Sequence, residues 1–307
     1  MSGSLVGKGL ESSSTYAKVR MAAYHRLRNA WYELTANFPE PVRGSLRKAT
    51  TTPLGYLASL TFRRRELVPP IRFRVRAGLG NWTKVGKEFA DIFVKFGGLQ
   101  PADRVLDIGC GFGRVATALV NYLNPRGSYE GFDVFPEAVE WCRARVTPLH
   151  PNFRFRLVDV HNGVYNPNGS VDPAHFAFPY SDGSFDFVHL TSVFTHMLPP
   201  GVENYLREIS RVLRTGGKCA ISCYLINEES VNLMNSGKSE PSFPSDHVRY
   251  RLQDRLHPER AVAYDVAFLR DRYVRNGFKI IEPILWGYWC GRDHFLSLQD
   301  IIIAEKG

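Results

Sequence analysis

Three glycines alternate with other residues in the segment VLDIGCGFGR at 105–114, between an apolar run and a helical pattern. Gly109, Gly111 and Gly113 allow the backbone to turn tightly and to approach a ligand closely. The helix that follows would offer unpaired N–H groups and a positive dipole end, which suit a carboxylate or a phosphate. Arg114 stands where the dinucleotide motif G-x-G-x-x-G has its third glycine, which disfavours a nicotinamide cofactor.

Three aspartates lie at the ends of the first three predicted strands: Asp107, Asp133 and Asp159. A carboxylate at Asp107 would repel a pyrophosphate but attract an ammonium group. Asp133 can accept hydrogen bonds from both ribose hydroxyls of a nucleoside, and Asp159 can accept one from an adenine amino group. Because the carboxyl ends of parallel strands meet at one edge of a sheet, the three acids define one crevice. A single aspartate is more often a turn or helix-cap residue, but the set favours a cationic amino-acid nucleoside over a dinucleotide.

Apolar runs alternate with helical patterns over most of the chain after residue 70. Five runs joined by helical patterns predict parallel strands with right-handed crossovers, and two last runs without a helix between them predict an antiparallel hairpin. The fold class is therefore α/β, a doubly wound, mostly parallel seven-stranded sheet with an antiparallel edge hairpin. The strands are expected at 104–110, 127–134, 153–160, 185–191, 218–225, 278–285 and 296–304.

Over residues 85–305 the chain resembles the class I S-adenosylmethionine-dependent methyltransferases. The resemblance rests on four motifs in the family's order: VLDIGCGFGR, GFDVFPEAVEWCRAR, FPYSDGSFDFVHLTSVFTHM and YLREISRVLRTGGKCAI. Thr215 departs from the family's usual proline, in a turn away from the site. The resemblance implies a methyltransferase with S-adenosyl-L-methionine as its cofactor.

The resemblance also assigns the residues around this cofactor. It implies that Asp107, Gly109 and Gly111 surround the methionine moiety. Asp133 would bind the ribose. Asp159 and Val160 would lie around the adenine. The complete predicted set is Asp107, Gly109, Cys110, Gly111, Gly113, Asp133, Val134, Asp159, Val160 and Thr191.

The end of the fourth predicted strand argues against two kinds of acceptor. The segment HLTSVF at 189–194 lacks the NPPY-like tetrapeptide of DNA amino-methylating enzymes, and no Pro-Cys nucleophile supports methylation at cytosine carbon. Thr191 stands where catechol-type O-methyltransferases place a magnesium-binding aspartate, so no metal is expected. We therefore expect a small-molecule or glycan acceptor and no nucleic acid.

Three segments should surround the acceptor, 191–201, 226–263 and 286–295. The segment 226–263 has no clean periodicity and is predicted to be a lid or acceptor-recognition insert. Its Ser, Asn and Arg residues favour a polar acceptor. The segment WGYWCGRDHF at 286–295 either orients a ring-shaped acceptor or packs against the N-terminal segment.

Histidines in two of these segments are candidates for a general base. His196 follows the fourth strand, near the point where the methyl group should emerge, and is the first candidate. His294 with Asp293 forms the second candidate pair. His196 has an alternative interpretation as a helix-start residue bonded to the backbone.

Positive charge is concentrated in the first quarter of the chain. Residues 1–76 hold 14 Lys and Arg against 4 Asp and Glu, a net charge of +10, whereas residues 77–307 hold 25 against 26, a net charge of −1. An amphipathic helix is predicted within 15–38. The predicted domains are a basic, partly helical N-terminal extension (1–70) and a methyltransferase domain (71–307). We expect the extension to contact an acidic membrane surface. The alternative is a solvated basic segment that packs partly on the domain.

Five cysteines without a CxxC pair indicate a reducing compartment. No run of about 18 apolar residues and no secretory signal are found, and the N-terminus, rich in Ser and Arg and poor in acids, leaves a transit peptide as an alternative. The expected location is the cytoplasm, with any membrane contact peripheral.

The leading hypothesis is a metal-independent O-methyltransferase acting on a small polar metabolite or a glycan. The alternatives are an N-methyltransferase, a cofactor-binding scaffold whose basic N-terminus binds a membrane or nucleic acid, and a nicotinamide dehydrogenase. The glycine loop with Asp107, Asp133 and Asp159 argues against an inactive scaffold.

Overall fold

The computed structural model describes residues 67–74, 81–245 and 247–307. The chain divides into two compact units, Met1–Asn81 and Trp82–Gly307. The described part of the first unit includes a short helix, α3 (Ile71–Arg74). The amphipathic helix predicted within 15–38 lies outside the described residues.

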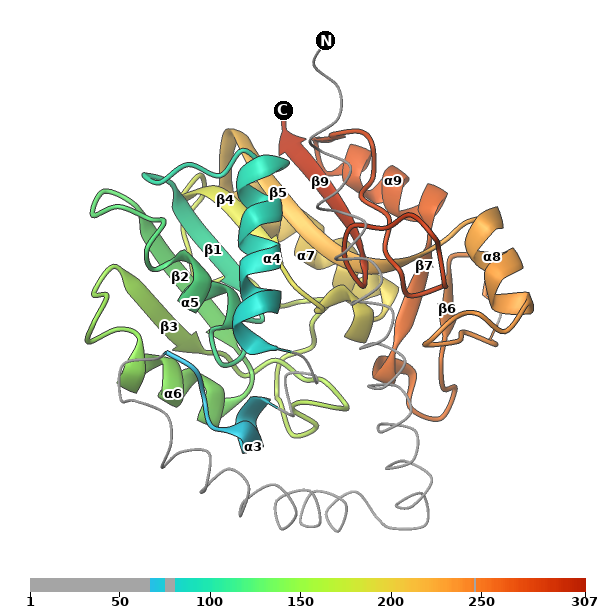
Figure 1. Cartoon of the computed structure of the whole chain (residues 1–307), viewed down its shortest axis with the longest axis horizontal. Helices are drawn as coiled ribbons and strands as arrows, with labels where there is room; N and C mark the ends of the chain where they lie inside the picture. The colour runs from blue at the N-terminus through green and yellow to red at the C-terminus, as the bar shows by residue number, and fades with distance from the viewer. Residues whose placement is uncertain (1–66, 75–80, 246) are drawn as a thin grey trace. The chain divides into compact units, whose positions relative to one another are not determined.

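The second unit is built on a twisted nine-stranded sheet (Figure 1). The hydrogen-bonded path runs β3-β2-β1-β4-β5-β7-β6, and β9 pairs with both β5 and β8. The strands are β1 (Arg104–Ile108), β2 (Ser128–Asp133), β3 (Phe153–Leu157), β4 (Phe185–Leu190), β5 (Leu213–Ile226), β6 (Tyr250–Leu252), β7 (Val262–Asp265), β8 (Phe278–Ile280) and β9 (Asp300–Lys306).

The pairing directions confirm the predicted fold class. Strands β1 to β5 pair in parallel, whereas β9 is antiparallel to β5 and to β8. Two strands were not predicted: β6 and β7 lie in or at the end of the segment 226–263 and have only three and four residues, too few for a period of two to stand out. Strand β8 is shorter than predicted, since Pro283 has no N–H to donate to a neighbouring strand.

Helices cover both faces of the sheet, with α4 in front of it and α7 behind it in Figure 1. Strand residues alternate between the two faces. Leu106, Ile108, Val188 and Leu190 belong to the same buried cluster as residues of α7 and α9. The helices of this unit are α4 (Trp82–Lys95), α5 (Arg114–Leu119), α6 (Pro136–Arg145), α7 (Pro199–Val212), α8 (Glu228–Asn235) and α9 (Val266–Arg275), with 3-10 turns η1 (Phe194–His196) and η2 (Pro258–Arg260).

Exposed apolar side chains include two in the segment 226–263: Val248 is 97% exposed and Leu256 is 87% exposed.

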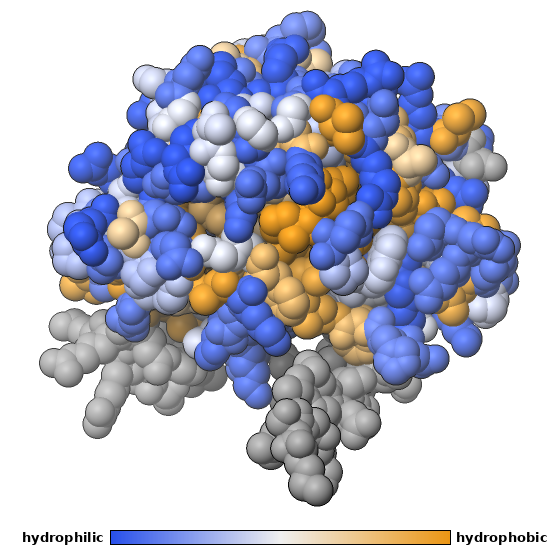
Figure 2. All heavy atoms as spheres, turned by 90° about the horizontal axis from the view of Figure 1, so that it is seen from above, coloured by the Kyte–Doolittle hydropathy of each residue, from blue (hydrophilic) through white to orange (hydrophobic). Residues whose placement is uncertain are grey.

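Seen from above the view of Figure 1, the surface is mostly hydrophilic, with a hydrophobic area near its middle (Figure 2). Across the described ranges, none of the helices combines the length and the apolar character that a membrane crossing requires.

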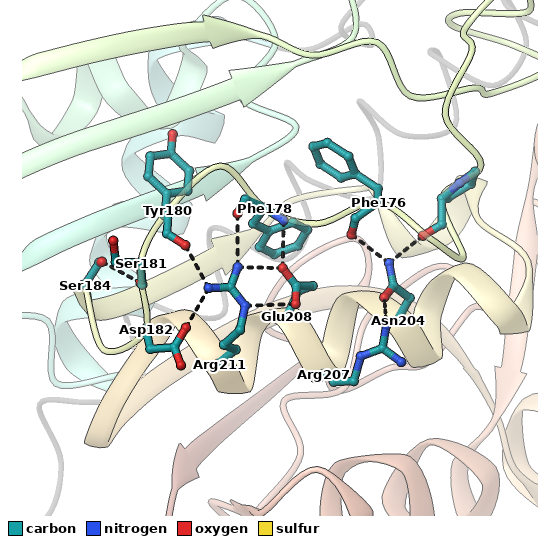
Figure 3. A network of polar contacts seen from close by, with 11 residues as sticks. Phe176, Phe178, Tyr180, Ser181, Asp182, Ser184, Asn204, Arg207, Glu208 and Arg211 are labelled. Carbon is teal, nitrogen blue, oxygen red and sulfur yellow. Dashed lines mark hydrogen bonds and ion pairs between the residues drawn. The ribbon is translucent and has the colours of Figure 1, made fainter.

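Glu208 on α7 anchors the segment that leads into β4 (Figure 3). Its carboxylate, 7% exposed, accepts a hydrogen bond from the Phe178 N–H at 2.7 Å and one from Arg211 Nη2 at 2.6 Å. Arg211 Nη1 in turn donates to the Tyr180 carbonyl at 2.7 Å. The connection between β3 and β4 is thereby attached to α7.

We expect Glu208→Ala to lower the free energy of unfolding by about 3 kcal/mol, because Arg211 and the Phe178 N–H lose a shared buried acceptor. Denaturant titration measures this change. Glu203→Ala is the matched control on the same helix: its carboxylate is 42% exposed and pairs with Arg272, so a loss below about 1 kcal/mol is expected. Equal losses in the two variants would contradict the anchoring role.

Candidate functional site

The three glycines of the loop at 109–113 have positive φ angles of 77°, 51° and 73°. The N–H groups of Gly109 and Cys110 donate to the Phe132 carbonyl at 2.9 and 3.1 Å, which attaches the loop to the end of β2. A Cβ atom at Gly109 would overlap Val193 Cγ2, whereas a Cβ at Gly111 would meet nothing within 4 Å. The loop is therefore closed at Gly109, where no space is left for a side chain, and open at Gly111, where the space beside the backbone is empty.

Asp133 lies against the open part of this loop. Its Oδ2 accepts a hydrogen bond from the Gly111 N–H at 2.7 Å and its Oδ1 accepts one from the Phe135 N–H at 2.9 Å. Burial raises the pKa of the carboxyl, and the backbone N–H groups oppose this rise. Each oxygen keeps a further lone pair that can accept a ligand hydroxyl.

Asp107 is buried, with 1% exposure. Its Oδ2 accepts a hydrogen bond from the Tyr129 hydroxyl, and its Oδ1 lies 3.3 Å from His189 Nδ1. Burial raises the pKa of the carboxyl to about 8. The assignment of Asp107 to the methionine moiety stays a prediction. Sequence reasoning missed Tyr129 and His189, although a tyrosine and a histidine inside apolar strands were a signal.

The end of β3 is shaped by the connection that follows it. Asp159 is exposed, and its Oδ2 accepts hydrogen bonds from the Ser170 hydroxyl at 2.5 Å and from the Ser170 N–H at 3.3 Å. These bonds lower the pKa of the Asp159 carboxyl. Val160 is buried and forms a bridge with Val171. The segment after β3 thus folds back on Asp159, and its contact with an adenine stays a prediction.

Residues from three distant segments meet at His196, the last residue of η1. The His196 Nδ1 lies 3.1 Å from the Glu259 carbonyl, and Asn162 Nδ2 donates to the His196 carbonyl at 2.8 Å. The Tyr165 hydroxyl lies 3.3 Å from Nε2. Burial lowers the pKa of the imidazole, while its bonds to the backbone at Glu259 and Arg260 oppose this change. The structure thus joins the first candidate base to the segment 226–263.

Comparison with known proteins agrees with this geometry. Residues 105–217, which contain the glycine loop, β1 except Arg104, and all of β2 to β4, match the family model described as a methyltransferase domain. This part of the chain is therefore a methyltransferase domain, as the resemblance to the class I S-adenosylmethionine-dependent methyltransferase family implies.

Two curated relatives match part of the chain. Methyltransferase GfsG of Streptomyces halstedii is 31% identical over 121 residues, which are 39% of this chain and 37% of that protein. The sarcosine/dimethylglycine N-methyltransferase of Halorhodospira halochloris is 34% identical over 122 residues, again 39% of this chain and 37% of that protein. The matched part therefore spans little more than a third of each relative.

A solved structure shares the fold of the chain more broadly. The PH0226 protein of Pyrococcus horikoshii superposes with a TM-score of 0.51 at 14% identity, over 80% of this chain and 97% of that one. At this level of identity the likeness concerns the fold.

S-adenosylmethionine is the cofactor of this family, and the residues of the methyltransferase domain fit it. The open position at Gly111 leaves room for a ligand beside the loop, and Asp133 offers acceptors for the ribose hydroxyls. Cys110 is buried, and Thr191 and Val134 are half-buried at the ends of their strands. When bound, the cofactor would supply an electrophilic methyl group on a sulfonium.

The second pair of candidate bases lies at an exposed tip. Asp293 and His294 are exposed, whereas Trp289 and Arg292 of the same segment are buried. Trp289 donates from Nε1 to Asp300 Oδ2 at 2.6 Å and packs on other aromatic rings in its cluster. Trp289 thus packs inside this unit, whereas Trp286, Tyr288 and Phe295 are half-buried. Through the part of the chain that the structure describes, no group of three or more His, Cys, Asp or Glu is placed to hold a metal ion.

A polar cluster directly after β4 escaped the sequence analysis. Ser192 has φ +64°, a left-handed value that a non-glycine residue rarely adopts. Its N–H donates to Ser222 Oγ at 2.8 Å, and its hydroxyl donates to Gln299 Oε1 at 3.1 Å. Ser222 also donates to Gln299 Oε1, at 2.7 Å. Ser222 and Gln299, from two distant segments, thus hold the turn at Ser192. The next residue is Val193, whose Cγ2 would overlap a Cβ atom at Gly109.

Proposed function

We propose that this protein is an O-methyltransferase that transfers a methyl group from S-adenosylmethionine to a hydroxyl of a small polar metabolite or a glycan. The observation that carries the proposal is the hydrogen-bonded setting of His196. The Glu259 carbonyl can only accept, so Nδ1 carries the proton and Nε2 keeps its lone pair. An acceptor amine in its neutral form attacks with its own lone pair and would not require such a base.

The proposed step uses this lone pair. His196 Nε2 takes the proton of the acceptor hydroxyl as the acceptor oxygen bonds to the methyl carbon and the carbon–sulfur bond breaks. S-adenosylhomocysteine and the methyl ether are the products, and the imidazolium returns its proton to water. In the free protein the Tyr165 hydroxyl, 3.3 Å from Nε2, can donate to this lone pair, and we infer that the acceptor hydroxyl takes its place. Tyr165 is 46% exposed, which is compatible with this exchange.

Incubation with methyl-labelled S-adenosylmethionine and pools of hydroxyl metabolites and oligosaccharides tests the proposal. Label in a methyl ether supports it. Label on nitrogen in amine-containing pools would favour the second candidate, N-methylation, which the name of the Halorhodospira relative suggests. Absence of cofactor binding in calorimetry would favour a scaffold role.

We expect His196→Ala to lower kcat about 100-fold or more while the Kd for S-adenosylhomocysteine changes less than about twofold, because the base acts on the acceptor. Steady-state kinetics and calorimetry give the two values. His175→Ala is the matched control, since its side chain is 81% exposed. An equal loss of turnover and cofactor affinity would remove His196 from the role.

For the N-terminal extension, we propose contact with an acidic membrane surface, supported by the net charge of +10 over residues 1–76. This contact is compatible with a cytoplasmic enzyme. Sedimentation with phosphatidylserine vesicles at low and high salt tests it, and binding unaffected by salt would contradict the electrostatic origin.

A further inference from the structure

Three buried polar side chains meet on three neighbouring strands below the glycine loop. Asp107 is on β1, Tyr129 is on β2 and His189 is on β4, with exposures of 1%, 0% and 0%. The Tyr129 hydroxyl bonds to Asp107 Oδ2 and lies 3.3 Å from His189 Nε2. His189 Nδ1 lies 3.3 Å from Asp107 Oδ1. The three side chains therefore form a closed ring.

Counting hydrogens shows what this ring lacks. The ring has three contacts, but a carboxylate, a hydroxyl and a neutral imidazole supply only two hydrogens, so either tautomer of His189 leaves one contact without a proton. With the imidazole proton on Nε2, the buried Asp107 Oδ1 and His189 Nδ1 have no hydrogen-bond partner. One added proton gives both atoms a hydrogen-bond partner. The Asp107 carboxyl then donates to His189 Nδ1, Nε2–H donates to the Tyr129 oxygen, and the Tyr129 hydroxyl donates to Asp107 Oδ2. Each group donates once and accepts once.

The surroundings keep this proton on the carboxyl. Phe93 of α4 packs on the His189 ring at 4.7 Å between centroids, which withholds water. Burial raises the pKa of Asp107 to about 8 and lowers that of His189 to about 3. Asp133 acts on Asp107 in the same direction, by like-charge repulsion. The other titratable groups that act on the ring are Cys110 and Cys142, and they oppose ionisation of Tyr129.

We propose that this ring holds one proton in the free protein and releases it to solvent when a cationic amino-acid nucleoside binds at the glycine loop. The inference rests on the proposed function, because the ligand is the cofactor. Asp107 lies two residues before Gly109, so a ligand ammonium or sulfonium at the loop stabilises the ionised carboxylate. Tyr129 and His189 are positioning residues that act through Asp107.

Calorimetry with S-adenosylhomocysteine at pH 7, in phosphate and in Tris buffer, measures the released proton from the difference in binding enthalpy. We expect release of more than half a proton, because the pKa of the Asp107 carboxyl lies above the pH of the measurement. The ligand 5′-methylthioadenosine has no amino-acid end and should release much less. Equal enthalpies in the two buffers would overturn the inference. Failure of S-adenosylhomocysteine to bind at all would instead overturn the proposed function.

Variants locate the proton. Asp107→Asn should abolish the buffer dependence, whereas the control Asp91→Asn should retain it, because the Asp91 side chain is 62% exposed on α4 and pairs with Lys87. Tyr129→Phe removes a hydrogen bond that favours the ionised Asp107 carboxylate and thereby lowers its pKa. In this variant, the pH at which ligand binding releases half a proton should therefore be higher than in the wild-type protein. Retention of the buffer dependence in Asp107→Asn would overturn the inference.

The wild-type protein gives an independent test if the Asp107 variant does not fold. Its association constant for S-adenosylhomocysteine should rise up to about tenfold per pH unit between pH 6 and 8 and level off above, since the ring must lose its proton to bind. A constant affinity over this range would overturn the inference.

Discussion

Replacing Asp133 with alanine is expected to weaken the binding of S-adenosylhomocysteine about 100-fold. The carboxylate accepts the N–H groups of Gly111 and Phe135, so its removal frees the open part of the glycine loop as well as the ribose acceptors. Hydrogen bonds to a charged group contribute about 1.5–3 kcal/mol each, and loss of one to two of them gives this change. Calorimetric titration measures it.

Asp133→Asn is the matched variant for this prediction. It keeps one acceptor oxygen and a side chain of the same shape, so we expect a loss of about tenfold. The melting temperature of each variant shows whether the loop alone or the whole domain is affected. Unchanged affinity in a folded Asp133→Ala protein would place the ribose elsewhere.

Replacing Gly109 with alanine is expected to destabilise the domain by about 3 kcal/mol. The residue has φ +77°, which costs an L-residue about 1–2 kcal/mol, and its new Cβ would overlap Val193 Cγ2, where overpacking adds about 1–3 kcal/mol. Gly111→Ala is the matched control, because φ is also positive but no atom lies within 4 Å. We expect it to cost about 1 kcal/mol. Chemical denaturation measures both.

The double variant Gly109→Ala/Val193→Ala separates the two causes. Removal of the Val193 branch relieves the overlap but leaves the backbone strain, so the double variant should be more stable than the sum of the single changes implies. Strict additivity would show that Val193 does not close the loop.

The sequence by itself determined the parts of this protein that depend on local pattern. The alternation of apolar runs and helical patterns predicted the parallel strands and the antiparallel edge, because side-chain periodicity follows from the geometry of each element. The spacing of Gly109, Gly111 and Gly113 predicted a tightly turning backbone loop, and all three glycines have positive φ. Pro136 correctly predicted the start of α6.

Only the tertiary structure decided which polar groups face one another. Asp107, Tyr129 and His189 are up to 82 residues apart, and they form a ring because β2, β1 and β4 are neighbours in the sheet. The contact between His196 and the Glu259 carbonyl likewise depends on how the segment 226–263 returns to the sheet edge. The folding back of Ser170 on Asp159 depends on a connection without periodicity. Hydrogen-bond partners distant in sequence leave no mark on local spacing, whereas burial makes their pairing obligatory once the chain has folded.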